Sequence, residues 1–495
     1  MLRSLNLENR FAGRRDELRP KPAYRWIVLA VASISAFGNM MSAGIVSVAL
    51  PYMASDLHVG INRVQLVVSL FLLLISALLP MFGRLSDQIG RKRVFTTGFV
   101  LYILGASAGF AGNFPLLLFF RLVQAVGGGM LMATNMALVT LAFPLEERGR
   151  GLGSLSSMAA AGSMSGPAVG GLLIAAFGWR SVFWINFPIG LIGYLVAEAL
   201  LVPDEKKNGH EPFDYPGAAV FGAMVVLLLV LLSEGPTWGW DSARTLATVG
   251  AAALTVILFI HRERRIPWPM VDLSLFRIPV FTLGNISGFL LYVIQYFNII
   301  LTPFYLQRVM GYSPAAVGLL MVPTPLVTTV TSPLAGWMSD RIGYMAPTTI
   351  GMGIMGVSMY LIGGLGASSG YLAVVVRLAI LGLGIALFNS PNNSSIMTAV
   401  PKTKVGITSS LVATVRNIGQ MAGTAMAASL FTAWAGAAAA ATSSLATVDT
   451  KLFLSAFAKV FDVGALLGLV GMAVCLIRAG QVKGTAAPSN EALRL

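Results

Sequence analysis

The sequence predicts an all-α integral membrane protein built from two related halves. Of its 495 residues, 56% are hydrophobic and only 11% are charged, whereas about 25% of residues are charged in soluble domains. Long apolar runs recur along the chain, each close to the ~20 residues that a helix needs to cross a bilayer. One short stretch, Pro80 to Arg93, returns later as Pro333 to Gly343, with Pro, Gly, Ser, Asp, Ile and Gly in matching places. This repeat indicates duplicated halves.

The apolar runs predict fourteen membrane helices in the order six, two, six. We expect a basic tail at 1–25, a first six-helix bundle at 26–202, a connector with two inserted helices at 203–265, a second six-helix bundle at 266–477, and a tail at 478–495. The expected spans are Trp26–Met53, Val64–Phe82, Val94–Ala111, Pro115–Leu138, Leu152–Phe177, Val182–Val202, Pro216–Leu232, Ala243–Ile260, Phe281–Tyr305, Ala315–Leu334, Ala346–Leu365, Leu372–Met397, Ile407–Ala433 and Phe453–Ile477. The inserted pair accounts for the two helices that a plain duplication would not need.

The net charge of +14 follows the membrane topology. When the spans alternate from a cytoplasmic N-terminus, most of the 34 Lys and Arg residues fall on the cytoplasmic side, as the positive-inside rule requires. We therefore expect a multi-pass protein of the inner cell membrane with both termini in the cytoplasm. Its partners would be the lipid bilayer and a small molecule, not nucleic acid, and we expect a monomer. The first 25 residues lack the apolar core of a signal peptide.

Enzymatic chemistry has no support in the sequence. The chain has three His and one Cys, and we find no metal-ligand cluster and no phosphate-binding loop. We expect no cofactor and no metal site, so the energy for any work would come from a gradient.

The repeated stretch places one carboxylate, Asp87, among basic residues at the cytoplasmic face, and Asp340 occupies the matching place in the second half. A carboxylate there can cap the positive end of a neighbouring helix or pair with an arginine, and such contacts break when the halves move. The expected conformational latch comprises Gly83, Arg84, Asp87, Gly90, Arg91, Gly336, Asp340 and Gly343. Alternatively, the basic residues only fix the topology, and Asp87 balances their charge.

Arginines within spans are the second signal. Arg121 lies about six residues, or about 9 Å, into the fourth span, at a depth close to that of Ser42 and Asn39 on the first. A charged side chain in hydrocarbon costs several kcal/mol unless it is paired or hydrated. Arg416 lies about 14 Å into the thirteenth span. It either meets an anionic group of a substrate or holds neighbouring helices through carbonyls, and Arg121 has the same structural alternative.

The fifth span has the pattern GxxxGPxxGG, formed by Gly162, Gly166, Pro167, Gly170 and Gly171. Small residues four apart let helix backbones approach closely, and a proline bends the helix. Taken alone, the glycine spacing mostly indicates packing.

Three of these motifs resemble those of the major facilitator superfamily. Gly83 to Arg93 resembles its signature loop between helices two and three, which stabilises the outward-open state. The Arg121 stretch resembles its second motif, whose arginine is linked to proton transfer. The Gly162 to Gly171 motif resembles that of the antiporter branch, so the resemblance implies export. With fourteen spans, the chain looks like the drug:proton antiporter family, with the major facilitator fold of two six-helix bundles plus two central helices.

One position departs from that family. Members usually carry an aspartate nine residues before the proline of Ala-Leu-Pro, and in this chain Ser42 occupies that place. Proton coupling needs a group that titrates while it is exposed to each side in turn, so we look to Asp87, Asp340 or Glu198, or to a substrate that carries the charge. The expected proton or charge relay comprises Ser42, Arg121, Glu198 and Arg416.

The substrate pathway should lie between the halves. Aromatic, methionine and amide side chains suit a large, mostly apolar guest. The expected substrate-binding residues are Asn39, Met41, Gln124, Asn135, Phe289, Tyr292, Gln295, Tyr296, Asn298, Asn389, Asn392 and Asn393. Helix packing is the alternative role for each of them.

These observations favour a secondary transporter that exports amphipathic drugs or antibiotics by alternating access in exchange for protons. Two alternatives stay open. One is an uncoupled exporter, or an exporter of lipids or anionic amphiphiles, with the same fold. The other is a membrane sensor that transports nothing.

Overall fold

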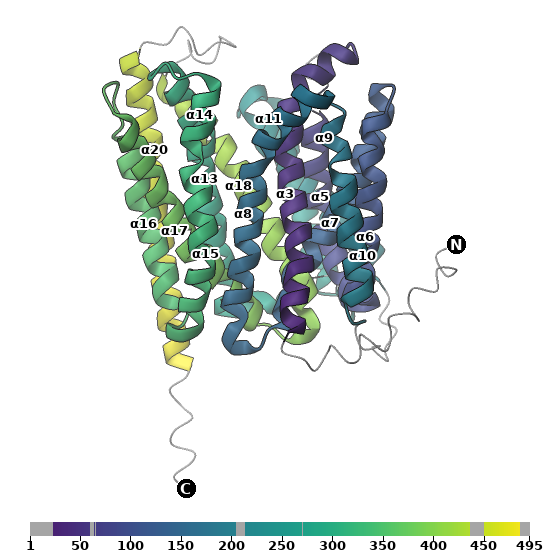
Figure 1. Ribbon diagram of the computed structural model, residues 1–495. Coiled ribbons are helices and arrows are strands. Elements are labelled where there is room, and N and C mark those ends of the chain that lie inside the picture. The colour runs from purple at the N-terminus through teal and green to yellow at the C-terminus, as the bar shows by residue number, and fades with distance from the viewer. Residues whose placement is uncertain are drawn as a thin grey trace. The chain divides into compact units, whose positions relative to one another are not determined.

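The computed structural model describes residues 23–59, 64, 66–203, 213–269, 271–435 and 450–485, and over these residues every regular element is a helix (Figure 1). The predicted basic tail lies almost entirely outside the described residues, as do most of the polar connector after Val202 and the last ten residues of the C-terminal tail.

The chain up to the connector forms six long helices with short helical turns between them. These elements are α3 (Tyr24–Asp56), α5 (Leu66–Ile89), α6 (Arg91–Gly105), η2 (Ala106–Phe110), α7 (Phe114–Ala142), η3 (Leu145–Glu147), α8 (Arg148–Phe177), α9 (Ser181–Trp184) and α10 (Asn186–Leu200). The inserted pair is α11 (Tyr215–Trp238) and α12 (Ala243–Glu263).

The second half has the same character. Its elements are η4 (Leu273–Arg277), α13 (Pro279–Arg308), α14 (Pro314–Met321), α15 (Pro323–Ile342), α16 (Met345–Gly363), α17 (Tyr371–Thr398), η5 (Lys402–Lys404), α18 (Val405–Ala435) and α20 (Thr450–Thr485). Each of the fourteen predicted stretches is thus helical over most of its described residues.

Twelve of the helical stretches in the described part are long and apolar enough to cross a membrane, and thirteen if the two bent parts of α8 count as one span. This confirms an all-helical, multi-pass membrane protein. The fourteen-span count is not confirmed, because α18 is not among these spans. At 31 residues it is long enough, but Arg416, Asn417 and Gln420 make it more polar than its neighbours.

The repeated stretch does not form a loop between the spans expected at Val64–Phe82 and Val94–Ala111. Helix α5 continues through Pro80 as far as Ile89, and a single residue, Gly90, separates it from α6. Gly90 has φ = 100°, and Gly343 at the matching place after α15 has φ = 81°. Only glycine adopts such angles without strain. Each half therefore changes direction at one glycine, and the preceding carboxylate stays on a rigid helix.

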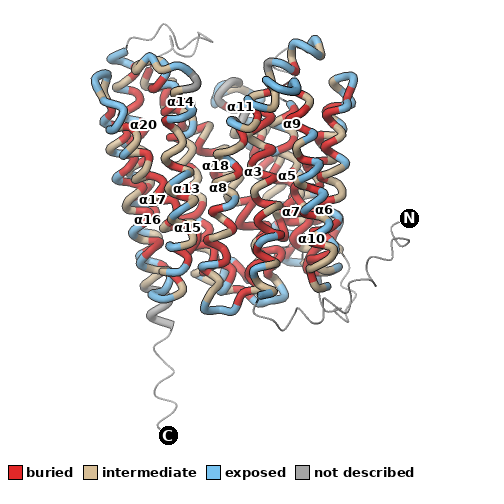
Figure 2. Tube along the Cα trace, viewed as in Figure 1, coloured by how far each residue is buried: buried red, intermediate tan, exposed pale blue. Residues whose placement is uncertain are grey.

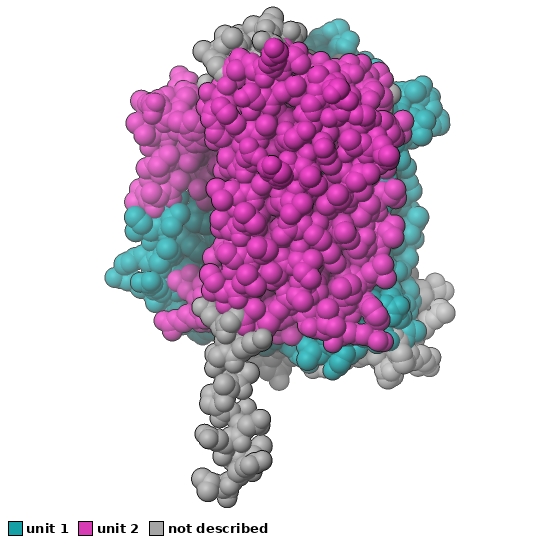
Figure 3. Space-filling view, turned by 90° about the vertical axis from the view of Figure 1, so that its left-hand side faces the viewer, with its two compact units in different colours: residues 1–226, 255–272, 400–414 teal, residues 227–254, 273–399, 415–495 magenta. Residues whose placement is uncertain are grey.

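The chain divides into two compact units (Figure 3). Unit 1 comprises 1–226, 255–272 and 400–414, and unit 2 comprises 227–254, 273–399 and 415–495. Unit 1 has apolar clusters along α3, α5, α6 and α7. Unit 2 has one large cluster, in which the Phe453, Phe457 and Phe461 rings of α20 stack along the helix.

Exposed apolar side chains are consistent with a lipid environment. Buried and exposed stretches alternate along most helices (Figure 2). On α12, Leu246, Leu254 and Ile257 are 60%, 57% and 64% exposed, a pattern that water would penalise and hydrocarbon would not.

Candidate functional site: a carboxylate cap and buried arginines

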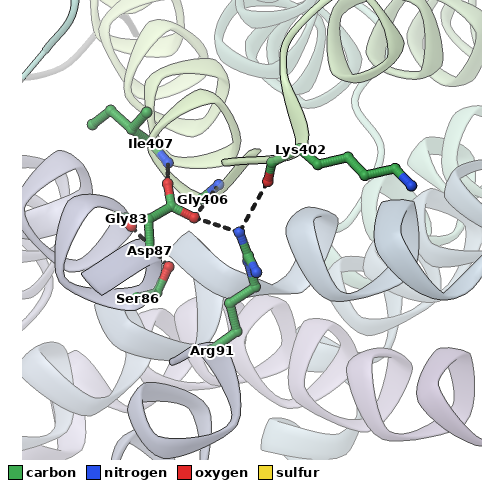
Figure 4. Close-up of polar contacts among 7 residues, drawn as sticks. All are labelled: Gly83, Ser86, Asp87, Arg91, Lys402, Gly406 and Ile407. Carbon is green, nitrogen blue, oxygen red and sulfur yellow. Dashed lines mark hydrogen bonds and ion pairs between the residues drawn. The ribbon is translucent and has the colours of Figure 1, made fainter. Parts of the chain in front are cut away.

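The Asp87 carboxylate at the end of α5 is only 4% exposed and is fully engaged in hydrogen bonds (Figure 4). Its Oδ1 accepts from Arg91 Nη2 at 2.6 Å and from the Gly406 backbone N–H at 3.1 Å, and its Oδ2 accepts from the Ile407 N–H at 3.0 Å. Gly406 and Ile407 are in the first turn of α18, where N–H groups have no acceptor within the helix. Asp87 therefore caps the positive end of α18.

Two glycines allow this contact. A Cβ at Gly83 would lie 2.3 Å from Ser410 Oγ and 2.7 Å from the Gly406 carbonyl oxygen, and a Cβ at Gly406 would lie 2.5 Å from Ser86 Oγ. Arg91 Nη2 also donates to the Lys402 carbonyl oxygen at 3.2 Å. The end of α5 and the start of α18 thus pack backbone against backbone, held by one carboxylate and one guanidinium.

The remaining expected latch residues differ in exposure. Arg84 is partly buried on the same helix as Asp87. In unit 2, Gly336 is buried, Asp340 is partly buried and Gly343 is exposed. A latch role for either copy stays a prediction.

Arg121 on α7 is fully buried, with 0% exposure. Its Nε donates to the Val67 carbonyl oxygen at 3.2 Å, and its Nη1 donates to Ser42 Oγ at 3.2 Å and to Gln124 Oε1 at 2.6 Å. The guanidinium carbon lies 3.7 Å from the centre of the Phe71 ring, which provides a cation–π contact. The structure thus brings Ser42 and Arg121 together, as their matching depths predict.

Further polar side chains form hydrogen bonds where α3 packs against α7. Ser35 Oγ donates to Asn135 Oδ1 at 3.0 Å, and Asn39 Nδ2 donates to the Ser35 carbonyl oxygen at 3.1 Å. Asn39, Met41, Gln124 and Asn135 are each at most 7% exposed. These four expected substrate-binding residues lie between helices in this conformation, and their contact with a substrate stays a prediction.

The glycine motif of α8 packs on α3. A Cβ at Gly162 would lie 2.4 Å from the Phe37 carbonyl oxygen, one at Gly166 would lie 2.9 Å from the Met41 carbonyl oxygen, and one at Gly170 would lie 2.9 Å from Ile45 Cγ1. By contrast, Gly171 has no atom within 4 Å of such a Cβ. The two parts of this span, Leu145–Gly166 and Ala168–Phe177, are inclined by 42° to each other.

In unit 2, polar groups gather where α13, α17 and α18 meet. Tyr292 Oη donates to Asn389 Oδ1 at 3.3 Å, and Asn393 Nδ2 donates to the same oxygen at 3.1 Å. Tyr292, Tyr296, Asn389 and Arg416 are partly exposed, whereas Asn393 is buried. Arg416 lies close to the Tyr292 hydroxyl. Contact between these residues and a substrate stays a prediction.

The other expected substrate-binding residues of unit 2 are either partly exposed or buried. Gln295 is partly exposed, and Phe289 packs against the apolar cluster of the unit. Asn298 is 1% exposed and accepts from Thr302 Oγ1 at 2.7 Å. Asn392, which is 2% exposed, belongs to a buried cluster that sequence reasoning missed.

That cluster is built on Arg478, near the end of α20. Its Nη1 donates to Asn392 Oδ1 at 2.7 Å, its Nη2 bonds to Ser395 Oγ, and its guanidinium lies over the Tyr344 ring. Asn392 Nδ2 in turn donates to the Gly284 carbonyl oxygen at 3.0 Å. Because Arg478 follows an apolar run, the sequence suggested a tail residue, yet it is 1% exposed.

Several ion pairs lie at helix ends of unit 1. Glu198, an expected relay residue, pairs with Lys92 at 3.6 Å. Asp214 accepts from Arg262 Nη2 at 2.7 Å, which joins the start of α11 to the end of α12. Lys404 pairs with Asp272. Asp56 accepts from Arg180 Nη1 at 2.8 Å and from Trp179 Nε1 at 3.1 Å, and these two bonds hold the pKa of its carboxyl below the ordinary value.

Among the described residues, no three His, Cys, Asp or Glu side chains are grouped as metal ligands would be.

Long apolar helices, a carboxylate-capped helix end and arginines within spans define a multi-pass membrane transporter. The chain matches the family model of the Major Facilitator Superfamily over residues 32–424, and it belongs to that family.

Relatives and solved structures agree with this assignment. The chain is 34% identical over 409 residues to the riboflavin transporter RibZ of Clostridioides difficile, which covers 82% of this chain and 88% of that protein. It is 33% identical over 415 residues to the multidrug resistance protein Stp of Mycobacterium tuberculosis, covering 83% and 76%. It is similar in fold to the human organic anion transporter MFSD10 (TETRAN), with a TM-score of 0.63, 16% identity and coverage of 92% and 100%.

Proposed function

We propose that this transporter exports amphipathic drugs or antibiotics across the cytoplasmic membrane by alternating access, in exchange for protons. The observation that carries this proposal is the Asp87 cap on α18, since hydrogen bonds to two backbone N–H groups and one arginine can break and re-form without covalent change. The drug cargo is supported by the similarity to Stp, a multidrug resistance protein, and to the tetracenomycin C resistance and export protein of Streptomyces glaucescens. This chain is 28% identical to the latter protein, and the match covers 83% of this chain and 76% of that protein.

We further propose that all fourteen helices cross the membrane, with both termini in the cytoplasm and the monomer as the working unit. Helix α18 is the case to decide. Its 31 residues extend about 46 Å at 1.5 Å per residue, which exceeds the hydrocarbon thickness of about 30 Å. Its polar residues suit a helix that lines the transport path.

A second candidate cargo is a planar vitamin such as riboflavin. RibZ is 34% identical to this chain over 88% of its own length. The Tyr292 and Tyr296 rings are partly exposed beside Arg416, and aromatic rings favour a planar guest.

Proton exchange is the part of the proposal with the most demanding test, because Ser42 replaces the carboxylate that would pair with Arg121. Purified protein in liposomes would be tested with a cationic, a neutral and an anionic dye and with riboflavin, each with and without a pH gradient. We expect an imposed pH gradient to drive uptake of an amphipathic dye into these liposomes. We also expect the coupling to disappear when Asp87, Asp340 and Glu198 are neutralised together.

The exposed carboxylate Asp241 provides the matched control, since Asp241→Asn changes one charge without touching the cap. Proton-coupled transport that persists in the triple variant would remove these carboxylates from the mechanism. Movement of riboflavin alone would replace the drug cargo, and dye movement that ignores the pH gradient would favour the uncoupled exporter.

A further inference from the structure

One nitrogen of the buried Arg121 guanidinium, Nη2, has no hydrogen-bond acceptor among the described residues. Its Nε and Nη1 are bonded, but its Nη2 has no hydrogen-bond partner. The Nε2 of Gln124 is buried and likewise has none. Arg121 Nη1 and Gln124 Oε1 form a hydrogen bond of 2.6 Å. Arg121 Nη2 is attached to the same carbon as Nη1, and Gln124 Nε2 is attached to the same carbon as Oε1. Two buried N–H donor groups without acceptors therefore lie close together.

The charge of Arg121 is also unbalanced. Within the described residues, its hydrogen bonds go only to a carbonyl, a hydroxyl and an amide oxygen, and no carboxylate forms an ion pair with it. The polar side chains nearby on the packed helices, Ser42 of α3, Tyr102 of α6 and Gln124 of α7, are neutral. A buried cation without a counter-charge is costly, and the contact with the Phe71 ring offsets only part of that cost.

We propose that Arg121 Nη2 and Gln124 Nε2 form a binding site for a small monovalent anion. The ligand is a halide-like ion or the single carboxylate of an organic molecule, since both supply one negative charge and accept from N–H donors. Both side chains, Arg121 and Gln124, are fully buried in this conformation, with 0% exposure. This inference does not depend on which molecule is exported.

Ser42 makes the proposal testable. Its Oγ lies 3.2 Å from Arg121 Nη1, so the carboxylate of Ser42→Asp would supply the counter-charge from within the chain. Ser42→Asn introduces a side chain of nearly the same shape as Ser42→Asp but without its charge, so it is the steric control.

The experiment measures thermal unfolding of the purified full-length protein in detergent at constant ionic strength. Sodium gluconate, whose carboxylate carries a bulky and strongly hydrated polyol chain, would be replaced stepwise by chloride, by nitrate, or by benzoate. We expect a saturable rise in Tm of about 2 °C or more in the wild type and in Ser42→Asn. We expect the rise to be lost in Arg121→Gln and in Ser42→Asp, and to persist in Arg264→Gln, which removes an exposed charge.

The chloride and benzoate arms distinguish a free inorganic ion from an organic carboxylate. A wild-type Tm that does not depend on the anion would overturn the proposal. The same is true of an equal rise in Ser42→Asp, which retains Arg121 and so decides the question even if Arg121→Gln does not fold.

Discussion

The backbone N–H of Ile407 lies 3.0 Å from Asp87 Oδ2, and this bond joins the end of α5 to the first turn of α18, more than 300 residues later in the chain. Since the same carboxylate also accepts from Gly406 and Arg91, a single side chain holds three donors. The contact depends on charge, on close packing at two glycines, and on the dipole of α18.

Asp87→Asn should loosen this contact. The amide keeps the volume but loses the charge and turns one acceptor into a donor that faces the Ile407 or Gly406 N–H. We expect a loss of about 1–3 kcal/mol in the free energy of unfolding, measured by thermal unfolding in detergent. Asp241→Asn on the exposed loop is the control, and equal Tm values for the two variants would contradict the prediction.

The glycine stripe of α8 offers a matched pair of substitutions. Gly162→Ala places a methyl 2.4 Å from the Phe37 carbonyl oxygen, whereas Gly171→Ala meets nothing within 4 Å. We expect Gly162→Ala to lower Tm and the yield of folded protein, because neither backbone can give way. Gly171→Ala should be neutral or slightly stabilising, by up to about 1 kcal/mol. Similar behaviour of the two variants would mean that α8 does not pack on α3 in this way.

Arg478 should matter far more than its position near the C-terminus suggests. Arg478→Ala leaves Asn392 Oδ1 and the Ser395 hydroxyl without their donor in a buried place, which costs about 1–3 kcal/mol for each unsatisfied group. Arg341 is the control, since it is exposed and only stacks on the Trp337 ring. Thermal unfolding of Arg478→Ala and Arg341→Ala should show a large loss only in the first variant.

The Asp56 cluster should respond to acid. The bonds from Arg180 and Trp179 lower the pKa of the Asp56 carboxyl, so its stabilising effect is complete above the ordinary pKa and disappears as the pH falls through the lowered one. The Tm difference between wild type and Asp56→Asn should be constant near neutral pH and should vanish in strong acid. A difference that grows on acidification would show that the sign is wrong.

The helices could be predicted from the sequence, because the length of an apolar run is a local property. The glycines that end α5 and α15 were visible for the same reason, although the sequence alone suggested a turn where α5 continues to Ile89. The partner of Asp87 was not visible, since Gly406 and Ile407 carry no charge. Arg478 was missed because an arginine after an apolar run usually reaches solvent. Which face of α3 or α7 points inward depends on packing, so the sequence alone could not decide between substrate contact and helix packing for Asn39 and Gln124.

The Asp214–Arg262 pair has a consequence for shortening the chain. It fastens the two ends of the α11–α12 hairpin to each other at 2.7 Å, so the polypeptide leaves the hairpin almost where it entered it. A segment with adjoining ends can be removed without rerouting what precedes or follows it. Splicing Phe213 to Arg264 through a few glycines would remove the hairpin, and the yield of folded protein would measure how far the remaining helices depend on it.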